Sequence, residues 1–521
     1  MRRRLLVLLV AAALATGCTP QPGGRIVYGL TLAPSGIDPH INASSELGIP
    51  LTSVYDTLVY QDPKTGEFVP GLAQQWEVSE DGKVYTFYLR RGVKFHDGTP
   101  FNAEAVRFNL ERIVSPDLAS QRARFMLGPY ERTEVVDEYT VRIILREPFA
   151  PLLDSLSQVY LAMASPTAVQ QWGSEYQLHQ VGTGPFIFVE YVPGDHLLLR
   201  RNPNYAWGPP VYQHRTAQLE EVEFRFFTDP ATRSPALESG AADVMGEIPP
   251  QDAARLQGSA DFRIEAVAIP GVSLMLFMNT TRSPLDDINV RQALLFGTDR
   301  KAIISAVFRD TSPVACGPLA AATFGYNPMV CQFYQPYNPD QAAALLEEAG
   351  WKDTDGDGVR DKDGQPLVLD FYLMGWGYMP EVGQLIADQW ARLGVRVQSQ
   401  VVSYPEALEI AKEGRHHLMP FNLSGSDPDI LRRFFHSQGG FNWSKVNDPE
   451  MDRWLEEGAR VSDRNRRADL YAKVQDRVME SALIIPIRDY VNLNGVSNRV
   501  QGLRFDARGW FPWLIDVTLR R

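Results

Sequence analysis

A histidine beside an aspartate stands at residues 96 and 97, in the stretch LRRGVKFHDGTPFNAEAV (89–106). An imidazole next to a carboxylate is a common acid/base pair in hydrolases. Neighbouring residues in a turn, however, have no spacing that directs both side chains towards a third group. Neither a GxSxG elbow nor an HExxH helix occurs in the sequence. We therefore expect His96 and Asp97 to form part of a structural turn with Gly98.

Two segments contain residue types that bind metals. His416 and His417 are adjacent, so in a helix or strand their side chains point apart, and a nickel site there is disfavoured. The segment DTDGDGVRDKDG matches a calcium loop at its first, third, fifth and ninth positions, which are Asp353, Asp355, Asp357 and Asp361. Its twelfth position is Gly364, where an EF-hand has glutamate. A weak structural calcium site and an Asp/Gly-rich hairpin turn both fit, and we expect no required cofactor.

The elements that would position these residues suggest an α/β protein. Residues 84–90 alternate like a half-buried strand, and Asn102 is a good N-cap for a helix that follows it. Helix patterns end at Gly350 and Gly394, and strand patterns follow them, which predicts a largely parallel sheet. A long helical stretch is expected from Pro449 to about Ala482. The chain of 521 residues is too long for a single core.

The N-terminus predicts export. Three arginines precede a short apolar run that ends in LATGC, which resembles a bacterial lipoprotein signal. We expect residues 1–17 to be a signal peptide, Cys18 to carry lipid and residues 18–24 to form a tether. The alternative is an ordinary cleaved signal with an incidental Cys18. Either way the mature chain lies outside the cytoplasm, in the periplasm or lipid-anchored on the outer face of the membrane.

Export also decides how the other cysteines and the charge are interpreted. Cys316 and Cys331 form an even pair in an oxidising compartment, which favours a disulfide over two buried thiols. The formal net charge of −12 makes nucleic acid an unsuitable partner.

Several segments, in order, resemble one family. The most specific is WEVSEDGKVYTFYLRRGVKFHDGTPFNAEAVRFNLERI at 76–113. The others are VYDTLV (54–59), GTGPF (182–186), RNPNYAW (201–207), FMNTTRSPLDDINVRQAL (277–294), YNPDQAAALLEEAGW (337–351) and SDPDILRRFFHSQGGFNWSKVNDPEMD (426–452). From about Arg25 to Val517 the chain is similar to the family 5 extracellular solute-binding proteins of ABC importers, which take up peptides, nickel and related solutes.

The resemblance implies a two-lobed α/β fold of the periplasmic-binding-protein type (type II, class C). Lobe I would contain residues 25–271 and 486–521, with an extra subdomain at about 56–175, and lobe II would contain 272–485. The solute would lie between the lobes, where closure excludes water. The partners implied are a peptide or peptide-like solute and the membrane permease subunits, and we expect a monomer.

Peptide-binding members of the family hold the ligand ammonium with an aspartate of lobe II. The resemblance places Asp427 there first and Asp429 second, because a buried carboxylate needs a cation. The alternative is an Asp-Pro turn in which Asp427 caps local backbone.

Dipeptide binders also use an arginine in a strand-to-helix loop of lobe II, for the ligand carboxylate. The corresponding loop, YLMGWGYMPEVG, contains no arginine. This favours a longer peptide, paired like a strand, or another solute that stacks on aromatic rings. The candidate contacts, each of which could instead be core packing, are Trp376, Tyr378, Asn442, Trp443, Phe421, Asn422 and Tyr55.

The expected function is therefore solute capture without turnover, followed by delivery to a permease. The alternatives are the same role for an oligosaccharide or nickel complex, a secreted hydrolase such as a peptidase, and a secreted receptor or chaperone. A hydrolase would need a triad or a zinc motif, and the sequence shows neither.

Overall fold

The computed structural model describes residues 23–520, apart from 34–36, 42–44, 121 and 334–335. The predicted signal peptide, Cys18 and most of the tether lie outside the described residues. Within the described part of the chain, none of the helices combines the length and the apolar character that a membrane crossing requires.

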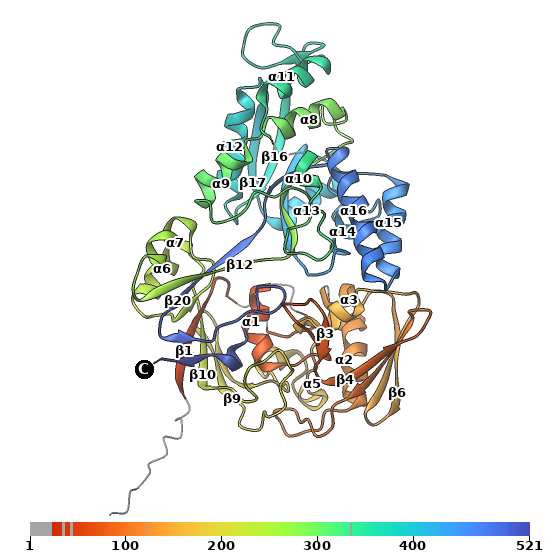
Figure 1. Cartoon of the computed structure of the whole chain (residues 1–521), viewed down its shortest axis with the longest axis vertical. Helices are drawn as coiled ribbons and strands as arrows, with labels where there is room; N and C mark the ends of the chain where they lie inside the picture. Colours follow the sequence, from red (N-terminus) through yellow and green to blue (C-terminus); the bar gives the residue numbers. More distant parts are fainter. Residues whose placement is uncertain (1–22, 34–36, 42–44, 121, 334–335, 521) are drawn as a thin grey trace, which may run out of the picture.

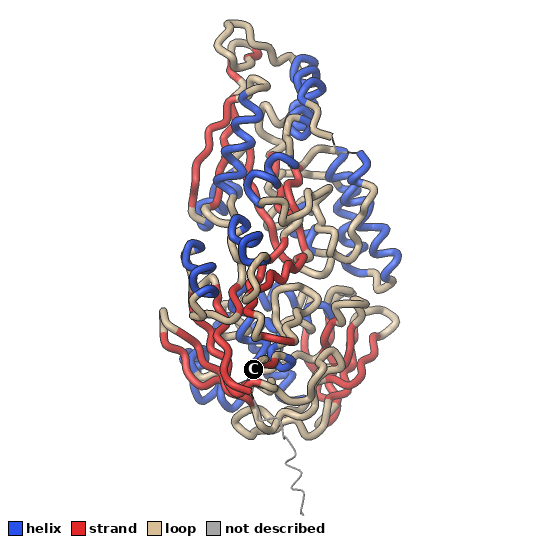
Figure 2. Tube along the Cα trace, turned by 60° about the vertical axis from the view of Figure 1, so that its left-hand side comes forward, coloured by secondary structure: helices blue, strands red, loops and turns tan. Residues whose placement is uncertain are grey.

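The described residues form two lobes, one above the other in Figures 1 and 2. Lobe I is built on a seven-stranded sheet in the order β12-β20-β11-β1-β10-β9-β8. Its central strand β1 is parallel to β10 and β11, and the other pairs are antiparallel. The strands are β1 (Gly23–Leu30), β8 (Phe186–Val192), β9 (His196–Arg201), β10 (Leu219–Phe226), β11 (Val244–Met245), β12 (Phe262–Ala268) and β20 (Val491–Ser497).

A second, four-stranded antiparallel sheet forms the subdomain of lobe I, in the order β4-β5-β7-β6. In β5 the alternation places Tyr85, Phe87 and Leu89 in the core, as expected for a half-buried strand. The Asn102 side chain accepts the N–H of Ala105 and begins helix α2, as predicted. The strands are β4 (Ala73–Val78), β5 (Val84–Leu89), β6 (Tyr130–Asp137) and β7 (Thr140–Leu145).

The helices of lobe I are short and most lie around its two sheets. They are α1 (Ser45–Val54), α2 (Ala103–Val114), α3 (Arg122–Met126), α4 (Leu152–Leu156), α5 (Pro166–Trp172), α6 (Pro230–Glu238) and α7 (Pro250–Gln257). Residues of α3 and α4 line a cavity whose other wall comes from lobe II.

Lobe II contains a five-stranded sheet in the order β17-β16-β18-β13-β19. The prediction of a largely parallel sheet is right for β16, β17 and β18 and wrong for β13, which runs antiparallel to both of its neighbours. The reason is that β13 enters lobe II directly after β12 of lobe I instead of following a helix. The strands are β13 (Gly271–Met278), β16 (Val368–Met374), β17 (Arg396–Val402), β18 (Leu418–Ser424) and β19 (Ile484–Arg488).

The helices of lobe II cover this sheet and extend towards the subdomain. The helical stretch expected from Pro449 is two helices, because Asp463 caps a new one by accepting the N–H of Arg466. The helices are α8 (Ile288–Phe296), α9 (Arg300–Phe308), α10 (Val330–Phe333), α11 (Pro339–Glu348), α12 (Met379–Ala391), α13 (Tyr404–Glu413), α14 (Ile430–Phe435), α15 (Pro449–Arg460) and α16 (Arg464–Glu480).

The chain crosses between the lobes at two adjacent places, which we call the crossovers. One joins β12 to β13 through Ile269 and Pro270, and the other joins β19 to β20 through Asp489 and Tyr490. The N–H of Ile269 bonds to the carbonyl of Tyr490, so the crossovers support each other.

A disulfide joins Cys316 to Cys331 in lobe II. The loop that it closes lies against the start of β13, where Ser273 Oγ donates to the Gly317 carbonyl at 2.7 Å. The same loop reaches α16, whose Gln475 donates to the Gly325 carbonyl at 2.7 Å. The disulfide therefore braces the part of lobe II that faces the subdomain.

Candidate functional site

The His96–Asp97 turn is part of the scaffold. His96 Nε2 lies 3.0 Å from the Gly184 carbonyl, and burial lowers the pKa of the imidazole to about 4. Asp97 accepts hydrogen bonds from Thr99 and from the Ser165 hydroxyl, at 2.6 and 2.5 Å. Both side chains thus hold neighbouring segments together, as the sequence predicts for a structural turn.

Several cavities lie between the lobes, and two of them border the same strand of lobe II. The subdomain cavity, of about 510 Å³, has walls from the subdomain and from lobe II that include Phe125, Asp154, Phe421, Asp427 and Arg433. The crossover cavity, of about 670 Å³, lies beside the crossovers, with walls that include Glu46, Arg233, Trp376, Tyr378, Asn422, Arg488, Tyr490 and Trp510. Each is large enough for part of a small solute.

Strand β18 links the two cavities. Its residues Phe421 and Leu423 line the subdomain cavity, and Asn422 lines the crossover cavity. A smaller space of about 150 Å³ shares Leu423 with one cavity and Asn422 with the other. The register of β18 with β16 stops at Leu418, while its pairing with β13 continues to Ser424. The end of β18 therefore lies between the lobes and borders both cavities.

Asp427 lines the subdomain cavity but already has a cation. Arg467 of α16 donates to its two carboxylate oxygens at 2.6 and 2.8 Å, and both side chains are largely buried. Asp427 also accepts the N–H of Asp429 at 2.9 Å, as in an Asp-Pro turn. Arg467 thus already supplies the positive charge that we expected a ligand ammonium to bring to Asp427.

Asp429 is compensated in the same way. Arg432 donates to both of its carboxylate oxygens at 2.9 and 2.7 Å, and the Tyr471 hydroxyl donates to it at 3.0 Å. Burial nevertheless raises the pKa of the Asp429 carboxyl. The SDPD segment fixes α14 to α16 through these bonds.

The walls of the subdomain cavity are rich in aromatic rings. Phe421 stacks against Tyr404 at 6.1 Å and against Phe441 at 5.7 Å. The Arg433 guanidinium lies over Phe441 at 4.8 Å and over Phe125 of the opposite lobe at 4.5 Å. Burial and the nearby Arg122 cation lower the pKa of Arg433. This end of the cleft suits an apolar or aromatic group.

The crossover cavity combines aromatic rings with charge. Trp376 is 44% exposed, and Tyr378, half buried, packs against Phe308 at 5.9 Å. Tyr378 has a φ of 63°, which is uncommon for a bulky residue and often marks a functional site. Trp376, Tyr378 and Asn422 are therefore brought together, as a solute site requires.

Three charged side chains of lobe I meet in the crossover cavity: Glu46, Arg233 and Glu247. Glu247 accepts the Tyr490 hydroxyl at 2.5 Å and lies 3.6 Å from Arg233. Glu46 accepts the N–H of Thr31 at 2.5 Å. Burial, reinforced by Glu247, raises the pKa of the Glu46 carboxyl to about 7.

Three of the predicted contact residues lie elsewhere. The Tyr55 hydroxyl lies 2.8 Å from that of Tyr176 in the core of lobe I. Trp443 is 2% exposed and packs against Phe277 in lobe II. Asn442 donates to the Val446 carbonyl at 2.8 Å and so holds its own loop. None of the three lines the subdomain cavity or the crossover cavity.

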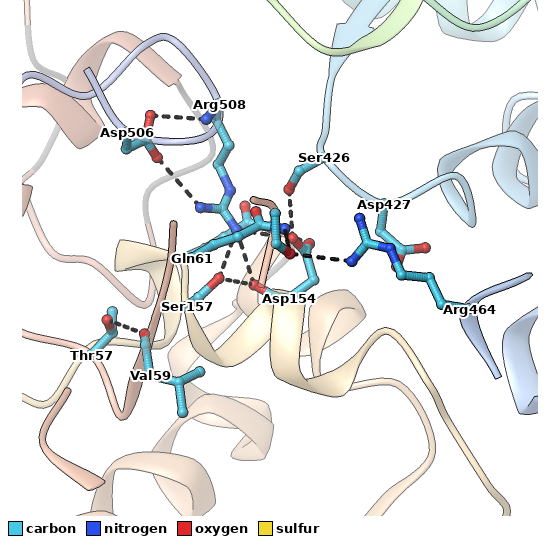
Figure 3. Close-up of polar contacts among 12 residues, drawn as sticks. Thr57, Val59, Gln61, Asp154, Ser157, Ser426, Asp427, Arg464, Asp506 and Arg508 are labelled. Atoms are coloured by element: carbon cyan, nitrogen blue, oxygen red, sulfur yellow. Dashed lines mark hydrogen bonds and ion pairs between the residues drawn. The ribbon is translucent and has the colours of Figure 1, made fainter. Parts of the chain in front are cut away.

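The lobes also touch through polar contacts, shown in Figure 3. Ser426 of lobe II donates to Asp154 of α4 at 2.5 Å, and Arg508 of the C-terminal segment donates to the same carboxylate at 3.0 Å. Farther out, the Ala150 N–H bonds to the Ala459 carbonyl at 2.8 Å. The Arg460 guanidinium lies 3.2 Å from the Glu147 carboxylate. These contacts close the subdomain side of the cleft.

The candidate metal ligands are remote from both cavities. Oxygen atoms of Asp353, Asp355 and Asp361 lie within 4.8 Å of one another, while Asp357 faces Arg396 at 3.4 Å. The three clustered carboxylates occupy the first, third and ninth positions of a calcium loop, and Gly364 leaves its twelfth position without one. His416 and His417 bond separately, to the carbonyls of Trp443 and Ser283.

Arg488, Tyr490 and Trp510 of the crossover cavity, and Arg433 of the subdomain cavity, were not anticipated from the sequence. One signal was available, because an arginine inside the apolar run IIPIRDY is rarely buried without a purpose. The partner of Asp427 could not be anticipated, because Arg467 is distant in sequence and belongs to another helix.

Comparison with known proteins supports a solute-binding fold. Residues 67–444 match the model of the bacterial extracellular solute-binding proteins, family 5. The chain is 28% identical to a di/tripeptide-binding protein of Pseudomonas aeruginosa, covering 97% of this chain and 96% of that one. It is 30% identical to heme-binding protein A of Haemophilus influenzae, covering 94% and 91%.

A solved structure supports the same fold. NikA from Brucella suis, in complex with Fe(III)-EDTA, superposes with a TM-score of 0.84 at 24% identity, covering 95% of this chain and all of that one. The α/β fold in two lobes, the cleft between them and the family match agree. The chain therefore belongs to the bacterial extracellular solute-binding proteins of family 5.

Proposed function

We propose that this protein captures a peptide or peptide-like solute between its lobes and delivers it to the permease of an ABC importer. The observation that carries the proposal is the line of interlobe cavities that meet at the end of β18. The di/tripeptide-binding relative supports a peptide as the solute.

The geometry favours an extended ligand. Strand β16 ends at Met374, shortly after its Phe371 pairs with Leu418, so β18 extends beyond it and a peptide backbone can lie beside the last residues of β18 as an added strand. Its side chains would then alternate between the cavities, with apolar groups against Phe421 and Phe441 and others against Trp376 and Tyr378.

We also propose that the solute is released unchanged and that Cys18 anchors the protein by lipid. The half-buried, backbone-bonded His96 supports the first proposal, because its imidazole is held by the Gly184 carbonyl and lines neither the subdomain cavity nor the crossover cavity. The lipoprotein-like LATGC segment supports the second. Mass spectrometry of the N-terminal peptide from the native host tests the anchor, and an unmodified Cys18 would contradict it.

The experiment for binding uses the purified mature chain and a mixed library of di- to pentapeptides. Native mass spectrometry should detect retained peptides with intact masses, and the free library should be unchanged after long incubation. Failure to retain any peptide contradicts the proposed solute, and catalytic turnover of any peptide contradicts the proposed role.

A further inference from the structure

The Arg488 side chain is a buried cation that lines the crossover cavity without an ion-pair partner. It is 5% exposed at the end of β19, and its Nη1 donates to Ser312 Oγ at 2.9 Å. Its Nε has no hydrogen-bond partner. The guanidinium lies over Phe308 at 3.9 Å and over Tyr490 at 4.6 Å, so it is held in place by aromatic rings. A fixed, desolvated guanidinium is strongly attractive to an anion.

Three other buried arginines of the described chain differ from Arg488 in their partners and their position. Arg467 and Arg508 pair with Asp427 and Asp154, and Arg291 donates to the carbonyls of Leu285 and Ser481. None of these three arginines lines the crossover cavity. Arg488 thus has the features of a binding group and not of an internal brace.

The carboxylates near Arg488 do not serve as its counter-charge. Glu247 lies close enough to favour the charged form of Arg488, but its carboxylate accepts the Tyr490 hydroxyl and faces Arg233. Glu46 faces the same cavity from α1, next to Glu247 and Arg233. Glu381, at the start of α12, is exposed at the cavity rim. Arg488 forms no ion pair with a carboxylate of any described residue.

We infer that Arg488 binds a carboxylate of the solute in the crossover cavity, with Trp376 and Tyr378 packing beside it. For a peptide this group would be the free C-terminus, lying at the Trp376 end of β18. The loop at Trp376 contains no arginine, and β19 supplies one from another direction. This inference rests on the proposed function, since it names the chemical group that the same cleft recognises.

The test compares two libraries of tripeptides with identical sequences, one with free C-terminal acids and one with C-terminal amides. The wild-type chain should bind acids roughly 10- to 100-fold more tightly than amides, the range for hydrogen bonds to charged groups. Arg488→Met should remove this preference by weakening acids and leaving amides nearly unchanged. Arg488→Lys keeps the charge without the planar fork and should retain part of the preference.

Two arginine variants serve as controls. Arg433→Met alters the subdomain cavity and should weaken acids and amides alike. Arg415→Met removes an exposed arginine that pairs with Glu413 and should change neither. If Arg488→Met does not fold, Arg488→Lys decides the matter, because a preference for acids as large as that of the wild-type chain would contradict recognition of the carboxylate by the guanidinium.

The outcomes separate the two proposals. Equal binding of acids and amides by the wild-type chain overturns the role of Arg488 and leaves peptide capture standing. Loss of the acid preference in Arg433→Met, but not in Arg488→Met, also overturns it. If neither library binds, the proposed peptide function fails and this inference fails with it.

Discussion

The two ends of the cleft differ in how their charges are balanced. In the subdomain cavity, Asp154, Asp427 and Asp429 each pair with an arginine of the protein. In the crossover cavity, Arg488 has no acid of the described chain to pair with. Removing one partner of a buried ion pair destabilises the fold, whereas a buried charge that has no partner is available to a ligand. We therefore expect the paired charges of the subdomain end to hold the fold and the unpaired Arg488 of the crossover end to select the charge of the solute.

The largest expected effect is a contrast in stability between two arginine variants. Arg467→Met leaves Asp427 buried without its cation and should lower the free energy of unfolding by about 3–5 kcal/mol. Arg488→Met removes a cation whose burial is not compensated, so the unliganded chain should change by about 1 kcal/mol or less. Chemical denaturation of both variants without solute measures this contrast. Equal losses would mean that both arginines are structural.

Loss of the disulfide should loosen the subdomain end of the cleft and leave the crossover end unchanged. Replacing Cys316 and Cys331 by serine should lower the free energy of unfolding by about 3 kcal/mol, given the sequence separation of 15. Because the closed loop packs against α16, hydrogen exchange should rise around residues 426–430. The Trp376 loop, which the disulfide does not touch, should exchange as before. A uniform rise in both segments would contradict a local brace.

Protonation should affect the crossover end through Glu46. Its pKa is raised from 4.5 to about 7, so the folded chain keeps a proton that the unfolded chain has released. Its contribution to stability is therefore greatest below about pH 4.5 and is lost as the pH rises through about 7, with a slope of at most about 1.4 kcal/mol per pH unit. Chemical denaturation at a series of pH values should show a smaller slope of stability against pH for Glu46→Gln than for the wild-type chain. Asp56 and Asp489, whose pKa values burial raises to about 6, remain in both chains, so the difference between chains isolates Glu46.

Loss of one hydrogen bond between the lobes should have a smaller effect, on the affinity for the solute. Ser426→Ala removes the hydrogen bond to Asp154, which exists only while the lobes touch. Affinity for a retained peptide should fall about 3- to 10-fold, from a loss of about 1 kcal/mol. Calorimetry should show this with little change in unliganded stability. Ser305→Ala removes an exposed serine that bonds to Asp310 and is the matched control.

The smallest effect concerns calcium, far from both cavities. If Asp353, Asp355 and Asp361 bind calcium with a millimolar dissociation constant, 1 mM calcium should add about 0.4 kcal/mol to stability. Asp355→Asn should abolish that gain, and the acid preference should not change in either chain. Absence of any thermal shift at 10 mM calcium would leave the hairpin turn as the correct interpretation.

The sequence predicted the elements better than the contacts between them. The alternation of β5 and the cap at Asn102 are local properties, and both were anticipated correctly. The pairing of Asp427 with Arg467 was not, because it depends on how α16 packs against the SDPD segment. Tyr55 and Trp443 illustrate the same limit, since an aromatic residue in a cleft and one in a core look alike in sequence.

The position of the interlobe contacts has a consequence for how the cargo leaves. The covalent links between the lobes are the crossovers, and the Ser426–Asp154 contact lies beside the first of them, because the N–H of Gly425 bonds to the Pro270 carbonyl. The Arg460–Glu147 contact lies farther out, between α15 and the subdomain. Force applied to α15 and α16 would therefore act with a long lever arm about the crossovers. It would break a few weak contacts one after another, each of about 1 kcal/mol. Unloading would then begin at the subdomain end, and the carboxylate at Arg488 would be the last group to be released.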